Sequence, residues 1–131
     1  MKTGETNLSA ILKSLSPVLN QGSYVFCSVA SDRAMTDNDV ICMFREEEGT
    51  TLIMKKERAD AAGLQYSVVM SWITLNIHSS LEAYGLTAAF SNALAEANVS
   101  CNVVAGVYHD HIFVPRNDAD KAMTVLKKLS S

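Results

Sequence analysis

The chain is poor in the residues that covalently stabilise small secreted proteins: of 131 residues, three are cysteine and two are proline. The cysteines, Cys27, Cys42 and Cys101, are odd in number and have no Cys-x-x-Cys spacing. This pattern favours reduced thiols in the cytoplasm over a disulfide framework. Each cysteine lies in an apolar stretch, where a thiol is usually inert. We therefore expect none of them to act as a nucleophile.

An excess of positive charge and long hydrophobic runs are also missing. The 11 Lys and Arg residues are outnumbered by 14 Asp and Glu residues, which leaves a net charge of -3. This balance argues against a nucleic-acid partner. The apolar runs are too short or too interrupted to cross a membrane, and the polar start of the chain lacks the apolar core of a signal peptide. We expect a soluble, cytoplasmic protein without membrane insertion.

Motifs for catalysis and for cofactors are absent as well. There is no glycine-rich phosphate loop, no Gly-x-Ser-x-Gly elbow and no paired-carboxylate signature. In His109-Asp110-His111 the two histidines share one face of a strand, but zinc needs three or four ligands and His78 is not at a useful spacing. Asp110 is better explained as part of a tight turn between strands. We therefore predict no enzyme, no metal and no cofactor.

What the chain does contain is a regular alternation of helical and strand patterns. The helix at 86–97 is the clearest, because its apolar positions follow the helical period at every step. Pro17 is expected to stop the first helix. Helices are predicted at 8–15, 56–62, 86–97 and 117–129, strands at 23–29, 40–45, 51–54, 66–77, 99–107 and 111–114, and a polar loop at 31–39.

A weak internal repeat organises these elements. Residues 51–62 align with residues 111–122, and both read as an apolar strand, a Lys or Arg, and a helix containing Ala-Asp-x-Ala. Chance similarity of two short units is the alternative. The order strand, helix, strand, strand, helix is ferredoxin-like, with an antiparallel sheet and helices on one face. We predict an α+β protein of two half-units, at residues 1–64 and 65–131.

Gly85 lies between a strand and the helix at 86–97, at a place suited to an anionic ligand. The first turn of a helix leaves its N–H groups without internal partners, and the helix dipole attracts a carboxylate or phosphate to them. The N–H groups of Gly85, Leu86 and Thr87 are the predicted donors. The alternative is that Gly85 only supplies a positive φ. Ser80 either adds a hydroxyl donor or caps the loop.

The C-terminal half resembles the ACT domain, a small ferredoxin-like regulatory module. The resemblance covers roughly residues 66–131 and rests on four segments, and the N-terminal half is similar to the partner module in small bacterial proteins with two ACT-like halves. The loop departs from the common Asp-x-Pro-Gly pattern, since it reads Glu82-Ala83-Tyr84-Gly85. The four segments are Ile73-Thr74-Leu75-Asn76-Ile77, Gly85-Leu86-Thr87, residues 94–104 and residues 108–115.

This resemblance implies that the protein binds an amino acid and is not an enzyme. ACT modules pair side by side, and their ligand lies between the glycine loop of one module and the second strand of a neighbour. The matching positions are Gly85, Leu86 and Thr87 in the loop, and Asn102 and Val103 in the strand. The Asn102 amide offers both a donor and an acceptor. We expect a non-enzymatic, allosteric sensor that forms a homo-oligomer; the alternative is an interaction protein that docks on an enzyme or transporter without a small ligand.

Overall fold

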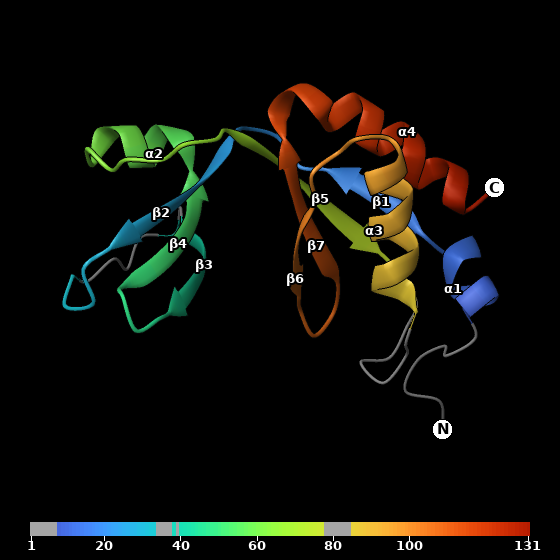
Figure 1. Ribbon diagram of the computed structural model, residues 1–131, viewed down its shortest axis with the longest axis horizontal. Helices are drawn as coiled ribbons and strands as arrows, with labels where there is room; N and C mark the ends of the chain where they lie inside the picture. The colour runs from blue at the N-terminus through green and yellow to red at the C-terminus, as the bar shows by residue number, and fades with distance from the viewer. Residues whose placement is uncertain (1–7, 34–37, 39, 78–84) are drawn as a thin grey trace. The chain divides into compact units, whose positions relative to one another are not determined.

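The computed structural model describes residues 8–33, 38, 40–77 and 85–131, and these residues belong to two compact units (Figure 1). The small unit is Gln21–Ser71. The large unit contains the segments before and after it, up to Asn20 and from Trp72 onward. None of the helices in the described ranges has the length and apolar composition needed to span a lipid bilayer.

The large unit is a sheet covered on one face by helices. Strand β5 lies between β1 and β7, and β7 pairs with β6 on its other side. The pairs β1–β5 and β6–β7 are antiparallel; for example, Val18 is opposite Thr74 and Asn102 is opposite Phe113. The elements are α1 (Leu8–Lys13), β1 (Ser16–Leu19), β5 (Met70–Asn76), α3 (Leu86–Glu96), β6 (Asn102–Ala105), β7 (Asp110–Pro115), the 3-10 turn η1 (Arg116–Asp118) and α4 (Ala119–Leu129).

The core of the large unit lies between the sheet and its three helices. Every second residue of β5 points into it, so Ile73 and Leu75 are fully buried while Trp72 and Thr74 on the other face are only partly covered. Helix α3 contributes a buried stripe at helical spacing. The fully buried members are Ile11, Ile73, Leu75, Phe90, Leu94, Ile112, Val114, Ala122 and Leu126.

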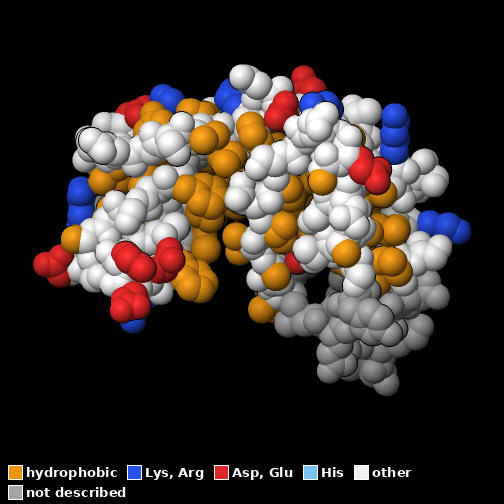
Figure 2. Space-filling model, in the orientation of Figure 1, with side chains coloured by type: hydrophobic (Ala, Val, Ile, Leu, Met, Phe, Trp, Pro, Cys, Tyr) orange, Lys and Arg blue, Asp and Glu red, His pale blue; other side chains and the backbone are white. Residues whose placement is uncertain are grey.

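The small unit is built from three strands and one helix in its described part. Its strand order is β3-β4-β2, with antiparallel pairs, and Tyr24 of β2 also pairs with Met70 at the beginning of β5. A separate core contains Val25, Leu52 and Met54. Figure 2 shows acidic side chains gathered over the turn between β3 and β4, which carries three exposed glutamates at residues 46–48. The elements are β2 (Tyr24–Val29), β3 (Val40–Arg45), β4 (Thr50–Lys55) and α2 (Lys56–Ala61).

The predicted fold class is confirmed: the chain is an α+β protein with antiparallel strand pairs and helices on one face of the sheet in the large unit. The compact units divide the chain differently from the predicted halves, 1–64 and 65–131. Residues 8–20 lie with the C-terminal residues, because α1 contributes to the large core and β1 pairs with β5.

One strand was missed in the sequence analysis, at Ser16–Leu19. Pro17 was interpreted only as a helix stop, but it lies inside this strand. Proline is tolerated in a strand at the edge of a sheet, where its missing N–H costs no ladder hydrogen bond. In the large unit β1 pairs with β5 alone, so Pro17 occupies such a position.

Two predicted strands are shorter than expected. The strand predicted at 66–77 begins only at Met70, because the Tyr66 hydroxyl donates to Asp60 Oδ1 at 2.6 Å and holds the preceding segment against α2. The strand predicted at 99–107 is confined to Asn102–Ala105. Val99 closes the end of α3, since its N–H donates to the Leu94 carbonyl at 2.9 Å. In both places, local hydrogen bonds keep residues out of the sheet although their sequence alternates as a strand does.

Candidate functional site

Gly85 begins helix α3 in a conformation that favours glycine. Its φ is +89° and its ψ is -16°, in the left-handed region. The Gly85 carbonyl accepts the first helical hydrogen bond, from Ala89 N–H at 2.9 Å, and no side chain caps the helix in the described structure. The positive φ proposed for Gly85 in the sequence analysis is therefore present. It orients the backbone so that the chain enters the helix directly.

Leu86 and Thr87 have different roles in the first turn of α3. The Leu86 side chain is buried in the large core, whereas Thr87 is exposed. Leu86 therefore anchors this end of the helix. The N–H groups of both residues lie in the first turn, where no helical carbonyl is available to them, at the positive end of the helix dipole. This end of α3 is suited to a carboxylate. Ser80 lies outside the described residues.

Leu8 lies beside Gly85, although no pattern in the sequence indicated that it belongs to the site. A Cβ added at Gly85 would lie 3.4 Å from Leu8 Cδ2. The side chain at the start of α1 therefore packs beside the entrance of α3. The sequence predicted Leu8 only as the first residue of a helix at 8–15. The two residues are 77 positions apart, so no local pattern indicates that they lie close together.

Asn102 and Val103 begin the edge strand β6. The Asn102 Nδ2 donates to the Phe113 carbonyl at 3.4 Å, so its hydrogen bond stays inside the β6–β7 hairpin. Val103 is 36% exposed opposite the buried Ile112. Gly85 starts α3, whereas β6 starts shortly after the other end of that helix (Figure 1). One copy of the chain therefore does not bring the two predicted segments together.

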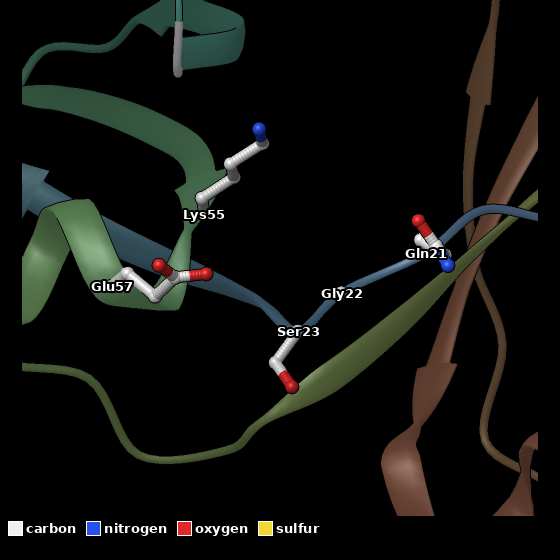
Figure 3. A pocket seen from close by; sticks show the side chains of 5 residues that line it. All are labelled: Gln21, Gly22, Ser23, Lys55 and Glu57. Atoms are coloured by element: carbon white, nitrogen blue, oxygen red, sulfur yellow. The ribbon is translucent and has the colours of Figure 1, made fainter.

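A surface pocket in the small unit is lined by residues that the sequence analysis did not select (Figure 3). Gln21, Gly22 and Ser23 lead into β2, while Lys55 and Glu57 lie where β4 meets α2. The Ser23 carbonyl accepts the N–H of Lys56 at 2.9 Å, which joins the two segments. The pocket presents an ammonium group and a carboxylate on an exposed surface. Charged groups in exposed positions provide weak binding energy.

The sheet of the large unit carries a polar cluster on the face opposite its helices. Trp72 Nε1 donates to His111 Nδ1 at 3.1 Å, and Thr74 Oγ1 lies 3.3 Å from the same nitrogen. His109 and His111 have ring centroids 6.3 Å apart. Asp110 begins β7 and does not form the turn, which is closed by the Gly106 N–H donating to the His109 carbonyl at 2.9 Å. Within the described ranges, no group of three metal-ligating side chains is present.

Two of the three cysteines, Cys27 and Cys101, lie in surroundings that disfavour the thiolate. Burial raises the pKa of Cys101 to about 11. Burial also raises the pKa of Cys27, and the Asp60 carboxylate adds to the increase. Cys42 is partly buried in β3. Because the thiolate is the reactive form, neither Cys27 nor Cys101 is suited to nucleophilic catalysis.

Cys101 is therefore expected to react slowly with a thiol reagent. A pKa of about 11 leaves roughly one thiolate in a thousand at pH 8, against about one in four at an ordinary pKa near 8.5. In the variant C27S/C42S, labelling by dithionitrobenzoate at pH 8 should be about 250-fold slower in the folded protein than in urea, in proportion to these thiolate fractions. Equal rates in the two states would contradict the burial of this thiol.

Comparison with known proteins identifies the class to which the chain belongs. Two ACT domain families match it, one over residues 3–71 and the other over residues 67–128. A solved Vibrio cholerae protein, described as of unknown function and a possible transport protein, is 46% identical and superimposes with a TM-score of 0.86. The match covers 96% of this chain and 98% of that one. The chain belongs to the ACT domain family, with two ACT-type segments.

More distant solved structures share the fold. The regulatory subunit of aspartate kinase from Thermus flavus has a TM-score of 0.62 at 10% identity, over 90% of this chain and 97% of that chain. An Agrobacterium tumefaciens protein has a TM-score of 0.69 at 15% identity, over 88% and 89% of the two chains. Aspartate kinase from Clostridium acetobutylicum has a TM-score of 0.60 at 9% identity, over 88% of this chain and 34% of the kinase. Among curated proteins, none matches.

Proposed function

We propose that this protein is a non-enzymatic regulatory protein that binds a free amino acid. The observation that carries the proposal is the left-handed Gly85 at the start of α3, because it opens the helix entrance to an anionic ligand in a chain of the ACT family. The ligand carboxylate would accept hydrogen bonds from the N–H groups of Gly85, Leu86 and Thr87. The fold shared with the regulatory subunit of an aspartate kinase supports a regulatory role.

The separation of Gly85 from β6 supports a site between two copies of the chain. Asn102 and Val103 begin a strand that lies beyond the far end of α3 from Gly85. A ligand that contacts both segments therefore needs the helix entrance of one copy and the edge strand of another. β6 is the edge of the sheet in the large unit, so its outer backbone groups are available for such a neighbour. Ligand binding would then favour the assembled state by differential affinity.

Thermal-shift measurement with each of the twenty amino acids tests the proposal. A ligand at about one hundred times its Kd stabilises the folded protein by about 2.7 kcal/mol, which raises Tm by several degrees for a chain of this size. We expect one amino acid, or a few related ones, to produce such a shift at millimolar concentration. Calorimetry on that amino acid should then give a Kd. A flat response to all twenty would contradict the proposal.

A second candidate function is docking on a larger protein without a small ligand. It is favoured by Met43 and Phe44 of the edge strand β3, which are 53% and 68% exposed. Large apolar side chains on an unpaired edge are typical of a protein-interaction surface. This function requires a stable partner complex that is unchanged by every amino acid and is weakened by F44S.

A further inference from the structure

His111 is held by two residues of the neighbouring strand. Its Nδ1 lies 3.1 Å from Trp72 Nε1 and 3.3 Å from Thr74 Oγ1, and both partners belong to β5. The Thr74 hydroxyl is oriented by Asn20, whose Nδ2 donates to Thr74 Oγ1 at 2.9 Å. Asn20 Nδ2 also donates to the Trp72 carbonyl at 3.2 Å. The imidazole thus connects β7 to β5 through side chains that are themselves fixed.

These contacts determine the protonation state of the imidazole. An indole N–H can only donate a hydrogen bond, so His111 Nδ1 must be the acceptor. An accepting Nδ1 means a neutral ring with its proton on Nε2. Thr74 Oγ1, which accepts from Asn20, also lies within hydrogen-bond distance of this nitrogen. A proton on Nδ1 would place two donors, the indole N–H and the imidazole N–H, against each other.

The surroundings of the His111 ring also favour its neutral form. Burial is the main factor that lowers the pKa of His111, the neighbouring His109 lowers it further, and the Asp110 carboxylate opposes both. The titratable groups that act on it are Asp110 and His109, one and two residues before His111 in the chain. Trp72 and Thr74, which contact it from β5, carry no charge, and neither does Asn20, which contacts Thr74. On β6, Val104 lies opposite His111 and is also uncharged.

We propose that His111 is a proton-sensitive link in the large unit: neutral, it fastens β7 to β5, and protonation in mildly acidic solution breaks its bond to Trp72 and loosens the β6–β7 hairpin. Its Nε2 lies beside the turn, 3.4 Å from where a Cβ on Gly106 would be. The hairpin also carries Asn102 and Val103. Acidification would therefore alter the strand that the proposed ligand site uses, although this link does not depend on ligand binding.

The direction of the pH effect follows from proton linkage. The pKa of folded His111 is below the ordinary value near 6.5, so the unfolded chain binds more protons at this residue. Its stabilising contribution is complete above about pH 6.5 and is lost as the pH falls from there toward the folded pKa. The pKa of Asp110 is raised by burial, so this carboxyl has the opposite effect in a more acidic range, just above its ordinary value.

Trp72 is the single tryptophan of the chain, and its fluorescence reports on the link. Emission should change as the pH is lowered from 7, with a midpoint below 6.5, because an imidazolium beside the indole quenches it. H111Q keeps an acceptor for the indole N–H but does not titrate, so its emission should stay constant over this range. H109Q is the matched control and should keep the transition. A transition that persists unchanged in H111Q would overturn the proposal.

A measurement on the unmodified protein covers the case in which H111Q does not fold. Two-dimensional ¹H–¹⁵N spectra of the histidine side chains report the tautomer and the pKa of each ring. We expect His111 to carry its proton on Nε2 at pH 7.5 and to titrate below pH 6.5. A proton on Nδ1, or a midpoint at or above 6.5, would overturn the proposal.

Discussion

Replacing Phe90 with alanine is expected to lower the free energy of unfolding by about 3–5 kcal/mol. Phe90 is fully buried in the middle of α3 and belongs to the core between the helices and the sheet of the large unit. Truncating its ring removes apolar area from the core and leaves a cavity that close-packed neighbours fill only in part. Urea unfolding, followed by circular dichroism and by the fluorescence of Trp72, measures the loss.

Phe44 provides a matched control for this substitution. It is 68% exposed on the edge strand β3, so F44A makes the same chemical change without opening a cavity. Its effect should stay within about 0.5 kcal/mol. Similar losses in F90A and F44A would show that burial in the large core does not determine the stability of this chain. The fluorescence transition should move only in F90A, because Trp72 belongs to the large unit.

Replacing Gly85 with alanine is expected to weaken amino-acid binding by at least about tenfold. A side chain at a φ of +89° costs roughly 1–2 kcal/mol, and the new methyl would lie 3.4 Å from Leu8 Cδ2. The backbone can relieve this strain only by turning away from the left-handed region, which reorients the N–H groups of the first turn. Calorimetry with the amino acid that gives the largest thermal shift measures the change in Kd.

The substitution G63A is the control that distinguishes a loss of amino-acid binding from a loss of stability. It also has a positive φ, +69°, and an added Cβ would meet no atom within 4 Å. It lies directly after α2 in the small unit. G63A should therefore destabilise the protein by a similar amount and leave the Kd unchanged. If G85A binds as tightly as the unmodified protein, the helix entrance is not the site; if both variants lose affinity equally, the effect comes from stability alone.

The internal repeat shows how much local sequence predicted about the fold. Each copy places an alanine four residues after the end of a strand: Ala59 lies in α2, and Ala119 begins α4 after the turn η1. Both alanines are buried, 0% and 8% exposed, because a small side chain lets the first turn of the helix approach the core. The pattern of the repeat thus predicted the helices after β4 and β7 correctly. It carried no information about which strands become neighbours in the sheets.

The candidate site was predicted only in part, for a related reason. The glycine at the start of α3 and the position of Asn102 in a strand were predicted, because a few consecutive residues are enough to indicate each. The contact of Leu8 with Gly85 was not, and neither was the hydrogen bond between Trp72 and His111, which are 39 positions apart. Such pairs depend on how strands align across the sheet, which no local pattern specifies.

Local sequence patterns predicted most of the helices and strands, although not β1, and carried the resemblance to the ACT domain. Alternation at 71–75 and the helical spacing of Leu86, Phe90 and Leu94 are local consequences of strand and helix geometry. Three features became visible only in the folded chain: residues 8–20 join the C-terminal unit, Pro17 lies in an edge strand, and His111 accepts a hydrogen bond from Trp72. These features depend on strand pairing and core packing between segments far apart in the chain. Such contacts contribute free energy only after folding brings the segments together.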